Sequence, residues 1–356
     1  LQSAHTIAAT DGYLYIFGSN IGVGGCIIAD ISNPAQPHFI GQYNEEYIHD
    51  GYIRNDTLWA GEIYVGQFSI IDVSNKSLPV LLNNQATPGA FCHNVWLSDN
   101  SNYAFTTDEV TGAPLGSFDV SNINNIQLKT VYFTDSIPNE EVHNVRVLND
   151  YLINPSYGSQ LTLVDAARPD NLIEIARAPT DFGSGQPFLC WDASPYLPSG
   201  NIIATDISGG LFVFTPDYKR ACYLEGITTD SITGSTLNNV LVEILNTTKS
   251  TSSDLPGNYK SGIATSGTYD IQFSKPGYIS KIYSGISLNN GVLTTLNAEL
   301  ASFSASGNVT SFQTTTGIPN VNISATNGSN TITATTDTNG NFTFNNIASG
   351  TYTITA

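Results

Sequence analysis

Four of the five histidines in this chain recur at a nearly constant interval. His5, His49 and His93 are separated by 44 residues each, and His143 follows 50 residues later. Another 48 residues on, Trp191 takes the equivalent place. Imidazole groups are ligands for zinc and other transition metals. The recurrence therefore raises the hypothesis of a metal or small-ligand site, with His49, His93 and His143 as candidate metal ligands.

The residue after each of these positions is polar, which supports a second interpretation. These neighbours are Thr6, Asp50, Asn94, Asn144 and Asp192. A buried polar group must find a partner, so the pairs are also explained as hydrogen bonds between successive repeats. Trp191 favours this structural interpretation, because a packing position tolerates tryptophan and a metal site does not need it. Both interpretations remain open, and no residue is assigned a catalytic role.

The histidines belong to a longer repeat, with a period in the forties, that covers the first 220 residues. Its clearest element is a hydrophobic run, an acid and a polar turn, at 26–34, 68–75, 116–122, 161–170 and 210–217. In the first four copies the acids are Asp30, Asp72, Asp119 and Asp165, and each is expected to bond backbone N–H groups of its turn. Four short strands per repeat predict β-propeller blades. The innermost strands line a propeller's channel, so the histidine positions should form a ring near one channel mouth.

The whole chain is predicted to be all-β, with three domains. Residues 1–221 are expected to form a β-propeller with at least five four-stranded blades visible, although the fifth copy lacks an obvious fourth strand. Either that strand is supplied from elsewhere, or the intact protein has six or seven blades. Residues 222–301 and 302–356 lack the repeat. Their strands show an alternating apolar and polar pattern and are joined in short hairpins by glycine-containing turns. They are expected to be two small prealbumin- or immunoglobulin-like β-sandwiches, the second truncated.

Composition excludes several classes of function. The 356 residues include 30 acidic and 12 basic side chains, for a formal charge of −18, which repels nucleic acid. No apolar stretch approaches the length of a membrane helix. The chain starts at Leu1 and contains no methionine, so we expect a processed or excised portion without a signal peptide.

The four cysteines leave two alternatives open. Cys26, Cys92, Cys190 and Cys222 show no C-x-x-C spacing, which argues against a structural zinc site. In an exported protein they are disulfide candidates, with three possible connectivities. The other alternative is four free, buried thiols.

Several segments resemble known families. HDGYIRNDTLWAGEIYVGQFSIIDVSNKSLPVLL, CHNVWLSDNSNYAFTTDEV and PYLPSGNIIATDISGGLFVF resemble the choice-of-anchor B proteins, which carry LVIVD-repeat propellers, over about residues 5–224. That resemblance implies an exported bacterial surface protein without an established enzymatic activity. The tail resembles carboxypeptidase regulatory-like domains of secreted Bacteroidetes proteins. A type IX secretion signal often follows these domains, so we expect a C-terminal signal outside this chain to direct export and anchoring.

Weaker motifs point to further sites. The D-S-I triplets at 135–137 and 230–232 resemble an O-glycan acceptor pattern of Bacteroidetes and make Ser136 and Ser231 candidate glycosylation sites. Three carboxylate positions, at Glu62, Asp108–Glu109 and Asp206, end second strands at one repeat position. They either join a polar channel mouth or form a solvated rim, and we favour the rim. The run from Asp337 to Asn341 resembles half of a calcium loop, but a simple Asn-Gly turn is the favoured interpretation.

The leading functional hypothesis is a non-enzymatic scaffold or binding protein that is secreted or held at a bacterial cell surface. It would act in adhesion by binding a glycan, a protein or a surface polymer. One alternative is a propeller enzyme with a histidine-lined site that acts on a polysaccharide or small molecule, with a divalent metal ion as its possible cofactor. Another is a structural component of a surface layer or filament.

Overall fold

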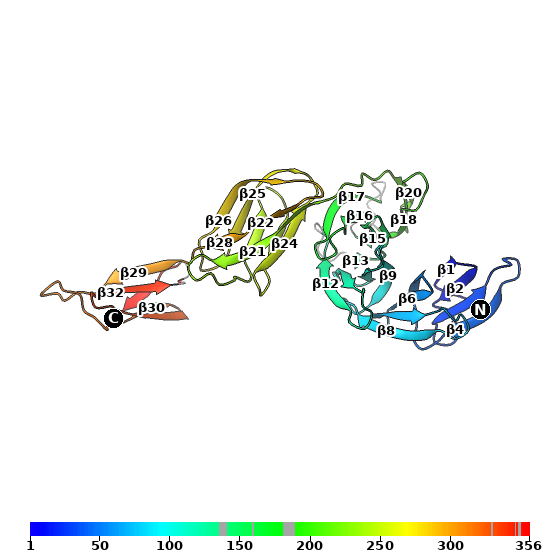
Figure 1. Ribbon diagram of the computed structural model, residues 1–356, viewed down its shortest axis with the longest axis horizontal. Helices are drawn as coiled ribbons and strands as arrows, with labels where there is room; N and C mark the ends of the chain where they lie inside the picture. The colour runs from blue at the N-terminus through cyan, green and yellow to red at the C-terminus, as the bar shows by residue number, and fades with distance from the viewer. Residues whose placement is uncertain (135–140, 159, 181–188, 329, 346, 348–349) are drawn as a thin grey trace. The chain divides into compact units, whose positions relative to one another are not determined.

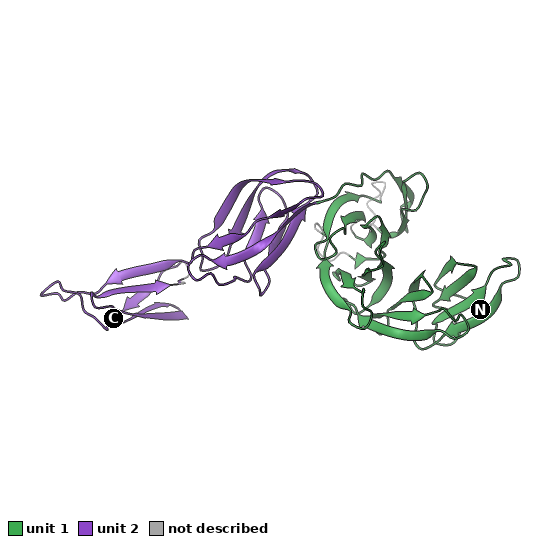
Figure 2. Cartoon of the chain, in the orientation of Figure 1, with its two compact units in different colours: residues 1–221 green, residues 222–356 purple. Residues whose placement is uncertain are grey.

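The chain folds into two compact units that meet in sequence between Ala221 and Cys222 (Figure 2). The computed structural model describes residues 1–134, 141–158, 160–180, 189–328, 330–345, 347 and 350–356. Among these residues all regular structure is β-strand, without a helix. The predicted all-β class is therefore confirmed. In the described part of the chain, no helix has the length and apolarity needed to cross a bilayer.

The first unit contains five antiparallel sheets that follow one another along an arc (Figure 1). The first two sheets comprise β1 (Thr6–Thr10), β2 (Tyr13–Phe17), β3 (Cys26–Asp30) and β4 (His38–Tyr43), then β5 (Asp50–Arg54), β6 (Thr57–Glu62), β7 (Gln67–Asp72) and β8 (Val80–Ala86). The third comprises β9 (Cys92–Leu97), β10 (Tyr103–Asp108), β11 (Leu115–Asp119) and β12 (Gln127–Tyr132). In each of these three sheets the strands pair in sequence order, as in a propeller blade.

The fourth and fifth blades depart from this pattern. The fourth contains β13 (Glu141–Val142), β14 (Arg146–Leu148), β15 (Tyr151–Tyr157), β16 (Gln160–Asp165) and β17 (Ile173–Ala178), because its first strand is interrupted between β13 and β14. The fifth has three strands in the described residues: β18 (Cys190–Ser194), β19 (Ile202–Asp206) and β20 (Gly210–Phe214). The described residues contain no fourth strand here, which corrects the prediction of five four-stranded blades and agrees with the lack of an obvious fourth strand in the sequence of this copy. After β20 the chain turns back to the fourth blade instead of pairing with β20, and Arg220 Nη1 donates to Asp165 Oδ1 at 2.7 Å.

The acid at the end of each third strand organises the turn that follows it. Asp30, Asp72, Asp119 and Asp165 each accept a hydrogen bond from the backbone N–H two residues later, at 2.7–3.1 Å. Just before the acid, the pairing of third and fourth strands shifts register in all four blades. Such an irregularity bends the strand and increases its twist. The expected turns are therefore present. In each of the four blades, the turn is preceded by the same shift in strand register.

Apolar packing between successive sheets forms the core of the first unit. Four clusters each join one blade to the next; in the first, Phe17 and Ile28 pack with Leu58 and Ile71 of the following blade. Burying one such side chain contributes about 1.5–3 kcal/mol. The outward faces of the first and fifth sheets lack this cover, since Ile7 is 63% exposed and Leu211 is also 63% exposed.

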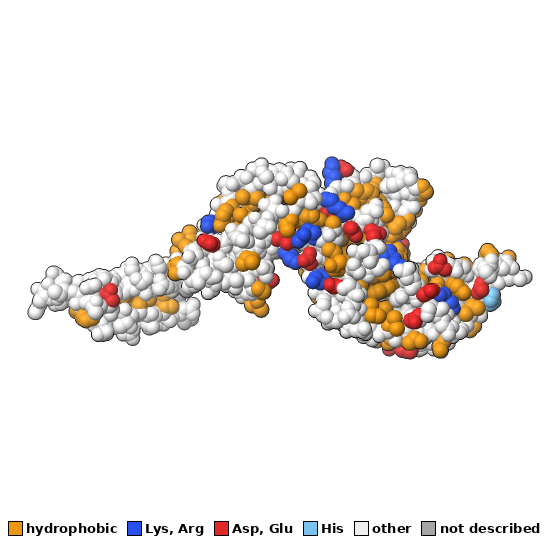
Figure 3. All heavy atoms as spheres, in the orientation of Figure 1, with side chains coloured by type: hydrophobic (Ala, Val, Ile, Leu, Met, Phe, Trp, Pro, Cys, Tyr) orange, Lys and Arg blue, Asp and Glu red, His pale blue; other side chains and the backbone are white. Residues whose placement is uncertain are grey.

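The second unit contains two β-sandwiches of different size. The larger pairs β21 (Cys222–Asp230), β24 (Asn258–Ile263), β27 (Leu293–Thr295) and β28 (Ala298–Leu300) in one layer, and β22 (Leu241–Ile244), β23 (Ser250–Ser252), β25 (Gly267–Ser274) and β26 (Lys281–Leu288) in the other. The smaller has β29 (Ser304–Asn308) with β32 (Asn341–Asn345), and β30 (Asn322–Asn327) with β31 (Asn330–Thr335) and β33 (Thr353–Thr355). In the face shown in Figure 3, few charged side chains lie on this second unit.

The cysteines are free and buried. Cys26, Cys92, Cys190 and Cys222 belong to four different hydrophobic clusters. The disulfide alternative is therefore wrong in this structure, because packing distributes the thiols over separate cores.

Asp165 differs from its repeat equivalents in a way that a pair of variants can test. It accepts hydrogen bonds from Arg220 and from the Ala221 N–H in addition to its own turn, whereas Asp119 accepts its hydrogen bonds from Ser121 within its turn. Asp165→Ala should lower the free energy of unfolding by about 3 kcal/mol, because it leaves a half-buried guanidinium and a buried N–H without this acceptor. Asp119→Ala should cost about 1 kcal/mol.

Urea denaturation followed by tryptophan fluorescence measures both losses, since all three tryptophans lie in residues 1–221. Equal losses in the two variants would contradict the special role of Asp165.

Candidate functional site

The four repeating histidines lie together at the inner ends of the first four blades. The centroid of the His49 ring lies 3.6 Å from that of His5 and 4.5 Å from that of His93, and the His93 and His143 centroids are 4.1 Å apart. Trp191 continues the series, 4.6 Å from His143. We call His5, His49, His93 and His143 the histidine cluster. The repeat position predicted to form a ring does bring its members into contact.

A glycine allows the second and third blades to approach this closely. Gly61 of β6 accepts a hydrogen bond from the His49 N–H at 2.8 Å. A Cβ atom at Gly61 would lie 2.7 Å from the backbone oxygen of His93 and 2.9 Å from that of Cys92. Such distances are too short for any side chain, so Gly61 sets the spacing between His49 and His93.

The polar residues beside the histidines join neighbouring blades. Asn94 Nδ2 donates to Asp50 Oδ2 at 2.6 Å, and Asn94 Oδ1 accepts from the Val145 N–H at 3.1 Å, so one amide links three blades. Asn144 Nδ2 donates to the Trp191 carbonyl at 3.2 Å. Burial raises the pKa of Asp50. The hydrogen bonds expected of the structural interpretation are therefore present at these positions.

Several ring nitrogens of the imidazoles, in contrast, lack a hydrogen-bond partner. Two of them contact a carbonyl through Nδ1: His5 reaches His49 O at 3.0 Å, and His143 reaches Trp191 O at 2.6 Å. Among the described residues, both ring nitrogens of His49, Nδ1 of His93 and Nε2 of His143 are buried without a hydrogen-bond partner. The structural interpretation leaves these nitrogens unexplained.

Burial keeps these rings neutral. His49, His93 and His143 are 8%, 2% and 1% exposed. Loss of solvent lowers the pKa of His49 to about 3 and that of His143 to about 4, and it lowers the pKa of His93 well below its ordinary value. Neighbouring histidines lower the pKa of His49 and His93 further. Neutral imidazoles keep a lone pair that can bind a cation.

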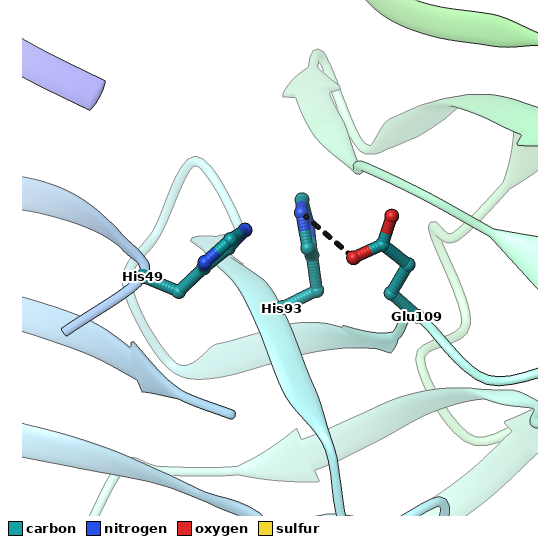
Figure 4. Close-up of side chains that lie close together, drawn as sticks. All are labelled: His49, His93 and Glu109. Carbon is teal, nitrogen blue, oxygen red and sulfur yellow. Dashed lines mark ion pairs between the residues drawn. The ribbon is translucent and has the colours of Figure 1, made fainter. Parts of the chain in front are cut away.

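Glu109 is the carboxylate that joins the cluster. Its two oxygens lie 3.6 Å from His93 Nε2 and 3.5 Å from His143 Nε2, and Figure 4 shows it facing His93, with His49 on the other side. Burial, with the charge of Glu141 as a smaller cause, raises the pKa of Glu109. The neighbouring Tyr157 hydroxyl lowers the pKa of Glu109 in part. Sequence reasoning treated Glu109 as a rim residue, although its position just after β10 was the available signal.

The other carboxylates at that repeat position stay outside the cluster and are buried, so the favoured expectation of a solvated rim is wrong for them. Asp108 accepts from the backbone N–H groups of Gly89 and Phe91, and Asp206 from that of Leu189. Glu62 accepts from Gln67 Nε2 at 2.8 Å. Each of these carboxylates accepts hydrogen bonds from a segment near the end of its second strand and is therefore shielded from solvent.

A second feature lies further along the inner strands. A cavity of about 250 Å³ is lined by β1, by Asp50 and Tyr52 of the second blade, by Trp96 of the third and by Arg146 of the fourth. The rings of Tyr52 and Trp96 have centroids 4.1 Å apart, and the Arg146 guanidinium lies 4.6 Å from the Trp96 centroid. Arg146 also pairs with Asp192 at 2.8 Å. Tyr52, Trp96 and Arg146 each stand three residues after a histidine of the cluster. This shared position is the sequence signal for the cavity, and the sequence analysis does not use it.

The remaining predicted sites fall elsewhere. Ser136 lies outside the described residues, and Ser231 is exposed in the turn after β21. The carboxylate of Asp337 accepts from the backbone N–H groups of Asn339 and Asn341 at 2.8 and 2.9 Å. These bonds are those of a turn, as the favoured interpretation of this run expected.

Family models match parts of both units. Residues 2–45 and 63–87 match the LVIVD repeat, and residues 224–301 and 304–356 match the carboxypeptidase regulatory-like domain. The chain thus carries LVIVD repeats followed by carboxypeptidase regulatory-like domains, which are domain types typical of extracellular or cell-surface proteins. No curated protein sequence matches the chain.

Solved structures resemble the chain only distantly. The β-propeller domain of Cps50 (Swd1) from Myceliophteria thermophila is 11% identical, with a TM-score of 0.43 over 58% of this chain and 68% of that one. A protein from Lactobacillus plantarum is 12% identical, with a TM-score of 0.46 over 74% and 84%. The periplasmic gluconolactonase PpgL of Pseudomonas aeruginosa is 12% identical, with a TM-score of 0.45 over 71% and 70%. Similarity at this level carries no argument about function.

Asn94 and Asn144 occupy one repeat position with different bonding, which gives a matched test of the links between blades. Asn94→Ala should lower the free energy of unfolding by about 3 kcal/mol, because it leaves the Asp50 carboxylate and the Val145 N–H without their partner. Asn144→Ala should cost about 1 kcal/mol, since one side-chain hydrogen bond is lost. Denaturation followed by tryptophan fluorescence measures both. A loss below about 1 kcal/mol for Asn94→Ala would show that the links contribute little.

Proposed function

We propose that this chain is a non-enzymatic binding protein of the bacterial outer surface, in which the LVIVD-repeat propeller binds a neutral saccharide and the carboxypeptidase regulatory-like domains act as a spacer. The observation that carries the proposal is the cavity along the inner strands. Its aromatic wall is Tyr52 and Trp96, and its polar groups are Asp50 and Arg146. Ligand sites typically combine an apolar lining with a few polar groups that fix orientation.

The chemistry of the cavity favours a neutral, polyhydroxylated ligand. Aromatic carbon supports the apolar faces of a sugar ring, while a carboxylate and a guanidinium can accept from and donate to its hydroxyl groups. The formal charge of −18 disfavours anionic ligands. The volume of about 250 Å³ suits a single sugar residue rather than a folded partner.

The domain types support a location outside the cell. The resemblance to choice-of-anchor B proteins supports a surface protein whose anchoring and export are directed by a C-terminal signal, and adhesion is the activity that a saccharide-binding surface protein would serve. The binding of another protein or of a surface polymer is the competing outcome of the experiment below.

A glycan array, followed by isothermal titration calorimetry with the best ligand, tests this proposal. Trp96→Ala should weaken binding at least tenfold, because it removes part of the aromatic wall. Phe39→Ala, at an exposed aromatic residue on β4, is the matched control and should bind like the wild type. Both variants need to keep the thermal unfolding midpoint of the first unit within a few degrees.

The proposal fails if no saccharide binds more tightly than about 1 mM, or if Trp96→Ala binds as well as the wild type. Turnover of a bound saccharide would contradict the non-enzymatic part alone.

A further inference from the structure

Two members of the histidine cluster, His49 and His93, and the carboxylate of Glu109 bring their ligand atoms close together. One ligand atom from each of His49, His93 and Glu109 lies within 4.8 Å of the other two (Figure 4). Around a tetrahedral zinc ion with bonds of about 2.0–2.1 Å, ligand atoms are separated by about 3.3 Å. The distance from His93 Nε2 to Glu109 Oε2 is already 3.6 Å. Small side-chain rotations are enough to close the set around one ion.

Buried lone pairs at this point have no hydrogen-bond donor in the described structure. A neutral imidazole carries one N–H and one lone pair, and neither nitrogen of His49 has a partner. Leaving such buried groups unpaired is costly. The links from Asn94 to Asp50 and to the Val145 N–H show that this repeat can satisfy polar groups between blades. A bound cation would account for the nitrogens that these links leave over.

His143 and Glu109 give the same indication independently. The Trp191 carbonyl can only accept, so Nδ1 of His143 carries the proton and Nε2 carries the lone pair. That lone pair faces Glu109 Oε1 at 3.5 Å. Two acceptors face each other there, an arrangement that a positive ion between or beside them stabilises.

One donor, His143, makes a supporting contact of the kind found in known metal sites. Metal-binding histidines usually donate their other ring N–H to a carbonyl or a carboxylate, which fixes the ring orientation. His143 does this with Trp191 O.

We propose that His49, His93 and Glu109 bind one divalent transition metal ion of the zinc class, with His143 as a fourth donor from the neighbouring blade. Two imidazoles and a carboxylate suit zinc and similar ions, whereas calcium and magnesium prefer oxygen ligands alone. The acidic chain favours cation uptake. This site is separate from the saccharide cavity and does not depend on that proposal.

The test uses the full chain, freed of metal with a chelator and dialysed. Zinc chloride titrated into the wild type by calorimetry should bind with one equivalent per chain, and the thermal unfolding midpoint should rise with zinc concentration. Cobalt(II) should give the visible absorption bands of a four-coordinate nitrogen and oxygen site. His93→Gln and Glu109→Gln should each weaken zinc binding at least tenfold. His38→Gln, which removes an exposed histidine 3.7 Å from Asp30, should bind zinc like the wild type.

Two results would overturn the proposal. One is a folded wild type that takes up no stoichiometric zinc or cobalt. The other is equal zinc affinity in the wild type, His93→Gln and Glu109→Gln. If a variant does not fold, the cobalt spectrum of the wild type decides: four-coordinate bands support the site, and the weak spectrum of six oxygen ligands contradicts it. Saccharide binding measured in the chelator-treated protein keeps the two proposals distinguishable.

Discussion

Burial of sheet faces against the neighbouring sheets is the interaction on which the first unit depends. A single four-stranded sheet of this length cannot bury its apolar side chains alone. Each blade therefore completes its core with the next, as the clusters that join Phe17 to Leu58 and Phe68 to Phe118 illustrate. Because the sheets are arranged radially, their inner strands converge. Where the inner ends of the second and third blades meet, Gly61 permits their close approach.

This convergence explains why polar chemistry collects at one repeat position. Water is excluded where inner strands meet, so each polar group there must find a partner from the adjacent blade. Asp50 and Asn94 do so through a hydrogen bond of 2.6 Å, and the Asn144 amide donates to the Trp191 carbonyl at 3.2 Å. The imidazoles lie against one another at tilted angles, and among the described residues four of their buried ring nitrogens have no hydrogen-bond partner. One position of the repeat thus serves two purposes: the residue after the histidine joins blades, and the histidine itself presents donors to the space between them.

Local features of this protein were the ones that sequence patterns predicted well. The turns after Asp30, Asp72 and Asp119 follow from a side-chain oxygen two residues from an N–H, which needs no distant contact. The contact among the histidines was anticipated because a constant interval in a radial repeat places equivalent residues side by side. Asp108 and Glu109 show the opposite case. They are adjacent in sequence, yet one accepts backbone N–H groups of a turn and the other faces two imidazoles, a difference that depends on which blade surface each side chain meets.

The sequence by itself determined the all-β class, the repeat and the recurring histidine position, because hydrophobic periodicity and turn chemistry act over a few residues. Only the tertiary structure decided which polar groups are buried and which partners they meet. It assigned the cysteines to separate cores and placed Glu109 between His93 and His143. Burial and long-range proximity arise from packing between blades, and no single repeat contains the information about its neighbour.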